Sequence, residues 1–401
     1  MYYLCPVCGE AKRKLPVKGV LWIYYDYKYV NSIISKYDLL NTIPGSIWKY
    51  PFLLPLNYEK RNSNYSISSV AEDDFTKLGM NTSLYKIYHD DSMITIFDDT
   101  LAPTLSFKDR ASVLVCLKAK QLGLSNISVA STGNAGASLA GICSRLNLNS
   151  HIFVPESIPK NKRLQIQSYT GNLYLVNGSY DDAFDLCHEI SDRNRWYNRN
   201  TAFNSLTIEG KKSAAYDIYI LNKGKLPDII FVPVGDGVVI SGLYKGFWEL
   251  YKLGFIDNYP KLIGVQSDGS DALVRYNKTD KFEFRHSSTI ADSICASAPR
   301  NLYMASEAVK STDGIVISVS DDEILTSQKL LSENYGILCE PSAAASLAGY
   351  LKLKKSNNTS YLTNVMLLIT GHGLKDTQAL EGLFANPDCK SYDEWLDKLK
   401  F

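Results

Sequence analysis

The stretch ISVASTGNAGASLAGICSRLNLNSHIFV, residues 127–154, decides the fold class of this chain. It holds a short apolar run, a turn of small residues, a longer amphipathic segment and a second apolar run. A short apolar run bounded by turn residues is typical of a buried strand, and a longer amphipathic segment is typical of a helix. We therefore predict a strand over 127–130, a helix over 136–146 and a strand over 151–154, which form one unit of a parallel sheet.

The same alternation continues toward the C-terminus. Further strands are predicted at 172–176, 229–234, 262–266, 314–319 and 365–370, and further helices at 180–193 and 208–221. A chain of 401 residues exceeds the roughly 250–300 residues at which a single core stops growing, so we expect two α/β domains. The aromatic run 20–29 predicts a small β appendage, and the polar segment 57–74 predicts a surface loop.

Composition narrows the class of partner. Forty-three basic and 42 acidic residues give a net charge of +1, which provides no general attraction for nucleic acid or an anionic membrane. No apolar run approaches the roughly 20 residues that a membrane helix requires, and the N-terminus does not resemble a secretory signal. Most cysteines are scattered singly, as in a reducing compartment. We expect a cytoplasmic protein without disulfides that binds a small molecule.

Four segments combine small, polar or reactive residues where predicted strands end and helices begin. Helix N-termini at such places offer free N–H groups and partial positive charge to anions. Ser131–Asn134 suits a carboxylate, Gly235–Val239 suits a phosphate, and Gly371 and Gly373 permit close approach of another group after a third strand. The fourth segment, Ala102–Arg110, contains Lys108, a lysine that burial would make reactive.

Each of these segments has an ordinary structural explanation when taken alone. A strand, glycine and helix connection is usually only a tight turn. Gly235 and Gly237 do not begin a Rossmann fingerprint, because Gly242 is misplaced for its third glycine. Most lysines are solvated, and most histidines such as His372 are structural. The combination of the segments in one chain is what indicates a site.

The motifs resemble one enzyme family. Pro103–Arg110 resembles the Pro-Thr-Gly-Ser-Phe-Lys-Asp-Arg motif of fold-type II pyridoxal-phosphate enzymes, and Thr370–Asp376 resembles threonine synthases in particular. Agreement runs in collinear order over about residues 46–385. The resemblance implies pyridoxal 5'-phosphate in a cleft between two domains, an amino-acid substrate and a homodimer. It also implies an appendage over 1–45, a large domain over 46–115 and 225–401, and a small α/β domain over 116–224.

Residue roles follow from the same resemblance. Lys108 would form the Schiff base with the cofactor and move protons at Cα and Cβ of the substrate, beside a neutral Thr370 at the pyridine nitrogen. Phe107 would flank the ring, and Asn134 would bond its 3' oxygen. The remaining implied contacts are those of the cofactor phosphate, Gly235, Asp236, Gly237, Val238 and Val239, and those of the substrate carboxylate, Ser131, Thr132, Gly133, Asn134 and Ala135.

Some positions depart from the family pattern. Ala102 and Leu105 replace the usual Asn and Gly around the lysine motif, and Leu105 is expected to narrow the space beside Lys108. Asp185 occupies the position expected to hold an Arg for the substrate phosphate of O-phosphohomoserine, which a carboxylate would repel.

Three hypotheses for the activity follow. The first is a threonine synthase-like lyase that turns O-phospho-L-homoserine and water into L-threonine and phosphate. The alternative is β-elimination or β-replacement on a serine-derived or other substrate with a different nucleophile. A third possibility is a regulatory homologue without activity, against which the intact Lys108, Asn134 and Thr370 argue.

Cys5 and Cys8 resemble half of the zinc ribbon that begins some relatives. Structural zinc normally has four protein ligands, and no further Cys or His occurs before His89. We therefore expect no metal.

Overall fold

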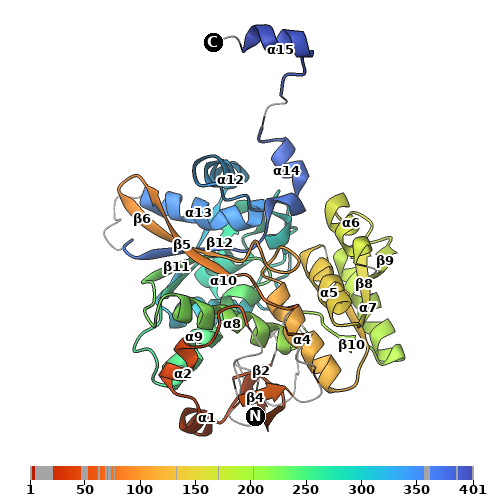
Figure 1. The fold of residues 1–401 in the computed structure, drawn as a ribbon, viewed down its shortest axis with the longest axis vertical. Helices are drawn as coiled ribbons and strands as arrows, with labels where there is room; N and C mark the ends of the chain where they lie inside the picture. Colours follow the sequence, from red (N-terminus) through yellow and green to blue (C-terminus); the bar gives the residue numbers. More distant parts are fainter. Residues whose placement is uncertain are drawn as a thin grey trace.

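A computed structural model describes most of the chain. The described residues are 2–4, 21–46, 53–61, 64–67, 70, 74–75, 77–131, 133–169, 171–201, 203–355, 362–384 and 387–399. Two parallel-rich sheets flanked by helices form its body, which confirms the predicted α/β class (Figure 1).

The larger sheet has six strands in the order β13-β12-β11-β14-β6-β5. All neighbouring pairs are parallel except β5 and β6, which form an antiparallel pair at one edge. The strands are β5 Ser83–His89, β6 Ser92–Asp98, β11 Ile229–Pro233, β12 Lys261–Ser267, β13 Ile315–Val319 and β14 Val365–Ile369. Four of them coincide with strands predicted from apolar runs. The helices that accompany this sheet in sequence are α9 Val238–Lys252, α10 Ala272–Thr279, α11 Leu302–Ser311, α12 Asp321–Tyr335 and α13 Pro341–Lys354, with short turns η3 Asp268–Ser270, η4 Asp292–Ile294 and η5 Gly373–Lys375.

The smaller sheet has four parallel strands in the order β10-β7-β8-β9. It comprises β7 Asn126–Ala130, β8 Asn149–Pro155, β9 Asn172–Val176 and β10 Tyr197–Asn198. Its connecting helices α5 Asn134–Arg145, α6 Lys160–Ser168 and α7 Tyr180–Asn194 gather beside it in Figure 1. The stretch 127–154 thus folds as predicted, with its two strands paired in register from Ile127 and Ser150 to Ala130 and Phe153.

Two long helices link the sheets to the rest of the fold. They are α4 Asp109–Gln121, which follows Lys108, and α8 Leu206–Leu221. The helices α8 and α9 pack closely because Gly246 of α9 has no side chain. A Cβ added at Gly246 would lie only 2.5 Å from the carbonyl oxygen of Lys212 in α8. The C-terminal helices are α14 Thr377–Glu381 and α15 Tyr392–Lys398, and α15 lies apart from the body in Figure 1.

The N-terminal region contains short elements. β1 Tyr2–Leu4 and β2 Trp22–Tyr24 form an antiparallel pair, followed by α1 Tyr27–Ile33 and α2 Lys36–Leu40. The predicted loop over 57–74 was wrong in part, because β3 Tyr58–Arg61 and β4 Asn64–Ile67 form an antiparallel hairpin. Ile67 and Val70 are buried there, which supplies an apolar anchor that the polar composition concealed. Cys5 and Cys8 lie outside the described residues.

A cluster of buried charges joins this N-terminal region to α8 and α9. The buried charge cluster consists of Glu209, Lys212, Lys245 and Glu249, all 0–1% exposed. Lys212 lies 2.5 Å from Glu209 and 2.9 Å from Glu249, and Lys245 pairs with Glu209. Tyr25 donates to Glu209 at 2.5 Å, and the Lys245 ammonium donates to the carbonyl of Ile23 at 2.5 Å. The chain around β2 therefore completes a polar network inside the protein.

No helix among the described residues has both the length and the apolar character needed to cross a membrane. The six cysteines described are free. No cluster of three or more His, Cys, Asp or Glu side chains in the described ranges is arranged to hold a metal ion.

Leu105 adopts a left-handed backbone conformation with φ +66°. Its carbonyl accepts the N–H of His372 at 3.1 Å, and the next residue, Ser106, bridges to Gly371. This turn joins the lysine segment to the end of β14. The left-handed conformation costs a residue with a Cβ about 1–2 kcal/mol, which explains why glycine suits this position. Leu105 does not line the cavity described below, so the expected narrowing beside Lys108 is not found.

Replacing Leu105 by glycine should stabilise the fold. Relief of about 1–2 kcal/mol of backbone strain outweighs the roughly 0.5–1 kcal/mol of extra chain entropy that glycine loses on folding. We expect Leu105→Gly to raise the free energy of unfolding by up to about 1 kcal/mol in urea titrations. Leu122→Gly is the control, because Leu122 is exposed with φ −88° and should only lose stability. Equal losses in both variants would contradict a strained Leu105.

Candidate active site

A cavity of about 360 Å³ opens between the two sheets. That volume lies within the roughly 300–1,000 Å³ typical of small-molecule sites. Its walls come from the ends of β7, β11 and β14 and from the starts of α4, α5, α7, α9 and α13. The sequence-predicted residues that line it are Lys108, Ser131, Asn134, Ala135, Gly235, Asp236, Gly237, Val238, Val239 and Thr370.

Lys108 immediately precedes the first residue of α4 and reaches the cavity. Burial lowers the pKa of Lys108, and the guanidinium of Arg199 lowers it further, while Asp236 and Glu340 act in the opposite direction. A lysine with a lowered pKa gives up its proton more readily, and the neutral amine is the nucleophile that attacks an aldehyde. The environment thus provides the reactivity that the sequence motif predicts.

The turn after β7 is fixed by its own side chains. Ser131 Oγ accepts the N–H groups of Gly133 at 2.9 Å and Gly136 at 3.0 Å. Gly133 does not line the cavity, and a Cβ there would lie 2.2 Å from Lys162 Cδ, so only glycine fits. Thr132 lies outside the described residues. The turn therefore aims the start of α5 at the cavity.

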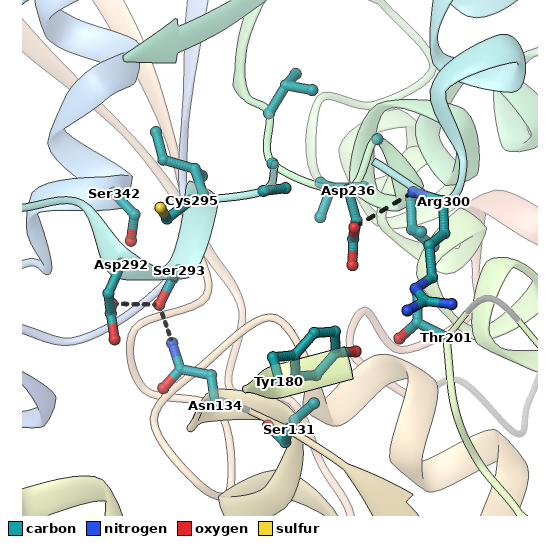
Figure 2. Close-up of a pocket in the computed structure, with 18 of the residues that line it drawn as sticks. Ser131, Asn134, Tyr180, Thr201, Asp236, Asp292, Ser293, Cys295, Arg300 and Ser342 are labelled. Carbon is teal, nitrogen blue, oxygen red and sulfur yellow. Dashed lines mark hydrogen bonds between the residues drawn. The ribbon is translucent and has the colours of Figure 1, made fainter. Parts of the chain in front are cut away.

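Asn134 connects the two sides of the cavity. Its amide donates to Ser293 Oγ at 3.0 Å and to Glu340 at 2.8 Å, while its Oδ1 is buried without a hydrogen-bond partner. Figure 2 shows Asn134 and Ser131 facing Ser293 and Asp292 from the opposite wall. A buried amide oxygen without a partner is a position where a bound group can complete the hydrogen bonding.

The segment Gly235–Val239 wraps the N-terminus of α9. A Cβ at Gly235 would lie 2.8 Å from Ile294 Cα, and Gly237 has φ +85°, so both positions favour glycine. The first N–H groups of α9 have no partner within the helix, and Val238, Val239 and Ile240 of this first turn line the cavity. Asp236 accepts the backbone N–H of Arg300 at 3.4 Å, and Figure 2 shows its carboxylate directed into the cavity.

Besides Gly133, two predicted residues lie away from the cavity. Phe107 is 1% exposed, donates its N–H to the Thr370 carbonyl at 2.8 Å and packs against Arg110, so it supports the lysine segment from behind. Asp185 is exposed and one turn further along α7 than Asp181, which does line the cavity. Only the first turn of α7 faces the cavity, so the expected contact of Asp185 with the substrate is not found.

Sequence reasoning missed several cavity residues. They are Tyr180, Lys211, Asp292, Ser293, Arg300, Glu340 and Ser342. Ser342 lies in the first turn of α13, next to the strand end that carries Thr370. The run Glu340-Pro341-Ser342 follows strand β13 and helix α12 and has proline in the first helical turn, a signal of a helix N-terminus that we did not use.

Two ion pairs connect the sheets across the cavity. Lys162 of α6 lies 2.5 Å from Asp292 and 3.4 Å from Glu340, and its side chain is 1% exposed. Arg300 pairs with Asp181 of α7 and stacks over the Phe184 ring at 4.0 Å. We call these the inner pair and the rim pair, because the second is much more exposed.

These features fit pyridoxal 5'-phosphate. The cavity holds a lysine with a lowered pKa, a helix N-terminus preceded by two required glycines, and an unpartnered amide oxygen. Lys108 would carry the aldehyde carbon, and the α9 N-terminus would hold the phosphate. The neutral hydroxyls of Thr370 and Ser342 line the same cavity and offer partners for a ring nitrogen.

Comparison with known proteins indicates the same cofactor. The model of the family described as pyridoxal-phosphate dependent enzyme matches residues 82–371. The threonine synthase of Methanocaldococcus jannaschii is 32% identical over 370 residues, which cover 90% of this chain and 88% of that protein. The threonine synthase of Methanosarcina acetivorans is 31% identical over 399 residues, covering 96% and 95% of the two chains.

Solved structures share the fold at lower identity. Maize serine racemase superposes with a TM-score of 0.65 at 17% identity, covering 79% of this chain and 93% of that chain. The processed form of threonine deaminase isoform 2 from Solanum lycopersicum gives a TM-score of 0.63 at 19% identity, covering 93% and 98%. The chain belongs to the pyridoxal-phosphate-dependent enzymes of fold type II, and within them to the threonine synthase-like members. It is a lyase that uses pyridoxal 5'-phosphate.

Proposed function

We propose that the enzyme converts O-phospho-L-homoserine and water into L-threonine and phosphate. The observation that carries this proposal is the match to threonine synthases along nearly the whole chain. The convergence of Lys108, Asn134, the α9 N-terminus and Thr370 on one cavity supports it.

Each residue would have a defined task in this reaction. When bound, pyridoxal 5'-phosphate supplies an electron sink for the substrate Cα. Lys108, with its lowered pKa, takes and returns protons at Cα and Cβ of the substrate. The neutral hydroxyl of Thr370 beside the ring nitrogen favours elimination and replacement over transamination.

The substrate carboxylate would bind at the turn after β7. Ser131, Ala135 and the N-terminus of α5 offer donors there, and Asn134 would bond the ring oxygen. The inner pair and the rim pair hold the two sheets together around the cavity and limit the entry of water. A water molecule adds at Cβ only after the bond between Cγ and the phosphate oxygen has broken.

The direct test uses purified enzyme loaded with the cofactor. O-Phospho-L-homoserine should release phosphate and L-threonine in equal amounts, measured by a phosphate assay and mass spectrometry. O-Phospho-L-serine and O-acetyl-L-serine with assorted nucleophiles serve as comparison substrates. Turnover of these compounds without turnover of O-phospho-L-homoserine would replace the proposal by the serine-derived alternative.

We also propose the domain division, the assembly and the compartment. The four-stranded sheet draws all its strands from 126–198, which supports a small domain over 116–224 with the remainder in the large domain. The cysteines beyond Cys8 are scattered singly along the sequence, which supports a reducing cytoplasm. Similarity to threonine synthases supports a homodimer, and light scattering that gives the mass of one chain would contradict it.

A further inference from the structure

We propose that Lys211, which lines the cavity from α8, binds a phosphate monoester dianion, and that the buried guanidinium of Arg199, which does not itself line the cavity, adds positive charge behind it. The bound group is either the phosphate of the cofactor or the leaving phosphate of the substrate. The second source rests on the proposed function, whereas the first does not.

Lys211 differs from the other buried lysines of the described chain. Five lysines are at most 3% exposed there, and four of them have oxygen partners: Lys162, Lys212 and Lys245 pair with carboxylates, and Lys375 donates to Thr104 and Gln165. Lys211 is 1% exposed and lines the cavity, and no described residue forms a hydrogen bond or ion pair with its amine. A buried ammonium without a counterion is costly, so an anion that entered the cavity would stabilise the charged form of Lys211.

Arg199 adds a second unbalanced cation. It is fully buried, and its donors reach only the hydroxyls of Ser112 at 3.3 Å and Thr201 at 3.2 Å. Its Nη2 has no hydrogen-bond partner. Among the described residues no carboxylate lies within ion-pair distance of this guanidinium, although arginine is well suited to bind phosphate through two parallel hydrogen bonds.

The pKa values show that these cations repel one another. Burial lowers the pKa of Lys211 well below its usual value, and Lys108 and Arg199 lower it further, whereas Asp236 raises it. Burial also lowers the pKa of Arg199 to about 10. A dianion in the cavity would contact Lys108 and Lys211 directly and Arg199 only at longer range, and this attraction must exceed the repulsion by the Asp236 carboxylate in the same cavity.

Helix packing brings Lys211 close to the α9 N-terminus. A Cβ at Gly242 would lie 2.8 Å from Lys211 Cβ, so the two helices touch there. Gly242 is one helical turn after Val238, the first residue of α9. The lysine charge thus adds to the free N–H groups of that N-terminus, a combination that recurs in phosphate sites.

The position of Lys211 suits either the cofactor phosphate or the substrate phosphate. The Gly235–Val239 segment that would hold the cofactor phosphate lines the same cavity as Lys211. The substrate phosphate also needs a cation, because the position aligned with the family Arg is Asp185, which is exposed and does not line the cavity.

The test compares Lys211→Met with Lys211→Arg, and Lys86→Met is the matched control on the exposed face of β5. Methionine removes the charge and keeps most of the length, so the variant should fold. Three quantities are measured on the full chain: the Kd of pyridoxal phosphate for the apoenzyme, the Kd of inorganic phosphate for the loaded enzyme, and the KM for O-phospho-L-homoserine.

A cofactor contact predicts that Lys211→Met weakens pyridoxal phosphate binding by about ten- to a hundredfold, with recovery in Lys211→Arg. A substrate contact predicts unchanged cofactor binding and a loss of about tenfold or more in inorganic phosphate affinity, with a raised KM. Arg199→Met should weaken the same affinity that Lys211→Met weakens, either that for pyridoxal phosphate or that for inorganic phosphate.

Changes below twofold in all three quantities, or equal changes in Lys86→Met, would overturn the site. Phosphate binding is measured without turnover, so it still tests the site if O-phospho-L-homoserine is not the substrate.

Discussion

Lys108→Ala should abolish covalent attachment of pyridoxal phosphate and reduce turnover by about a thousandfold or more. A positioned proton-transfer group alone is worth about 10²–10⁴ in rate, and this variant also removes the amine that binds the cofactor aldehyde. The N-terminus of α9, with its two required glycines, stays intact, so the cofactor should still bind without a covalent bond.

Borohydride reduction followed by peptide mass spectrometry measures the attachment. The wild-type protein should carry the reduced cofactor on Lys108, and Lys86→Ala on the exposed face of β5 should behave like the wild type. Lys211 is the informative competitor, because it lines the same cavity and burial lowers its pKa as well. Attachment at Lys211 in the wild-type protein, or turnover near the wild-type rate in Lys108→Ala, would contradict the assignment.

Glu209→Gln should lower the free energy of unfolding by about 3–5 kcal/mol, the usual loss when one member of a buried ion pair is removed. Glu209 is the shared partner of Lys212, Lys245 and the Tyr25 hydroxyl, so the change leaves buried lysine charge uncompensated. Guanidinium or urea unfolding monitored by circular dichroism measures the loss. Glu333→Gln is the matched control, because its pair with Lys329 is half exposed and should contribute at most about 1 kcal/mol.

The stability that Glu209→Gln loses should become smaller as the pH falls. Burial alone would raise the pKa of Glu209, but Lys212 and Lys245 hold it below its usual 4.5. A carboxyl with a lowered pKa in the folded state stabilises the fold above its unfolded-state pKa, and this contribution disappears as the pH falls through the folded value. The wild type should therefore exceed Glu209→Gln in free energy of unfolding by the largest amount at neutral pH, and this excess should shrink below pH 4.5. A difference that grows in acid would exclude this role for the pair.

The sequence was sufficient where local pattern determines structure. Apolar runs such as 229–234 and 365–370 predicted the central strands, because a buried parallel strand is apolar on both faces. Gly235 and Gly237 marked the turn before α9 for a steric reason that the structure makes explicit in contacts with Ile294 and Asn301. Ten of the predicted site residues line one cavity, because they follow the carboxyl ends of parallel strands or begin helices in both sheets.

The remaining features depend on contacts between distant segments. Nothing near Lys211 in sequence predicts that it lacks a partner while its neighbour Lys212 has two. Ser293 and Glu340 reach Asn134 only because the two sheets meet. The sequence placed Asp185 beside the substrate, but in α7 it lies one helical turn beyond Asp181. Asp181 lines the cavity, whereas Asp185 faces solvent. The polar sequence of the β3–β4 hairpin gave no alternation from which to predict it.

The inner pair and the rim pair give ionic strength a selective effect on this enzyme. In the inner pair the Lys162 and Glu340 side chains are 1% and 2% exposed and Asp292 is 31% exposed, whereas the Arg300 and Asp181 side chains of the rim pair are 29% and 70% exposed. At physiological salt, charges in water are screened beyond about 8 Å, and exposed pairs weaken further as salt is added. Added salt should therefore weaken the rim pair more than the inner pair, whose lysine is buried, so electrolyte concentration should act on how molecules enter and leave more than on the arrangement of the groups that react.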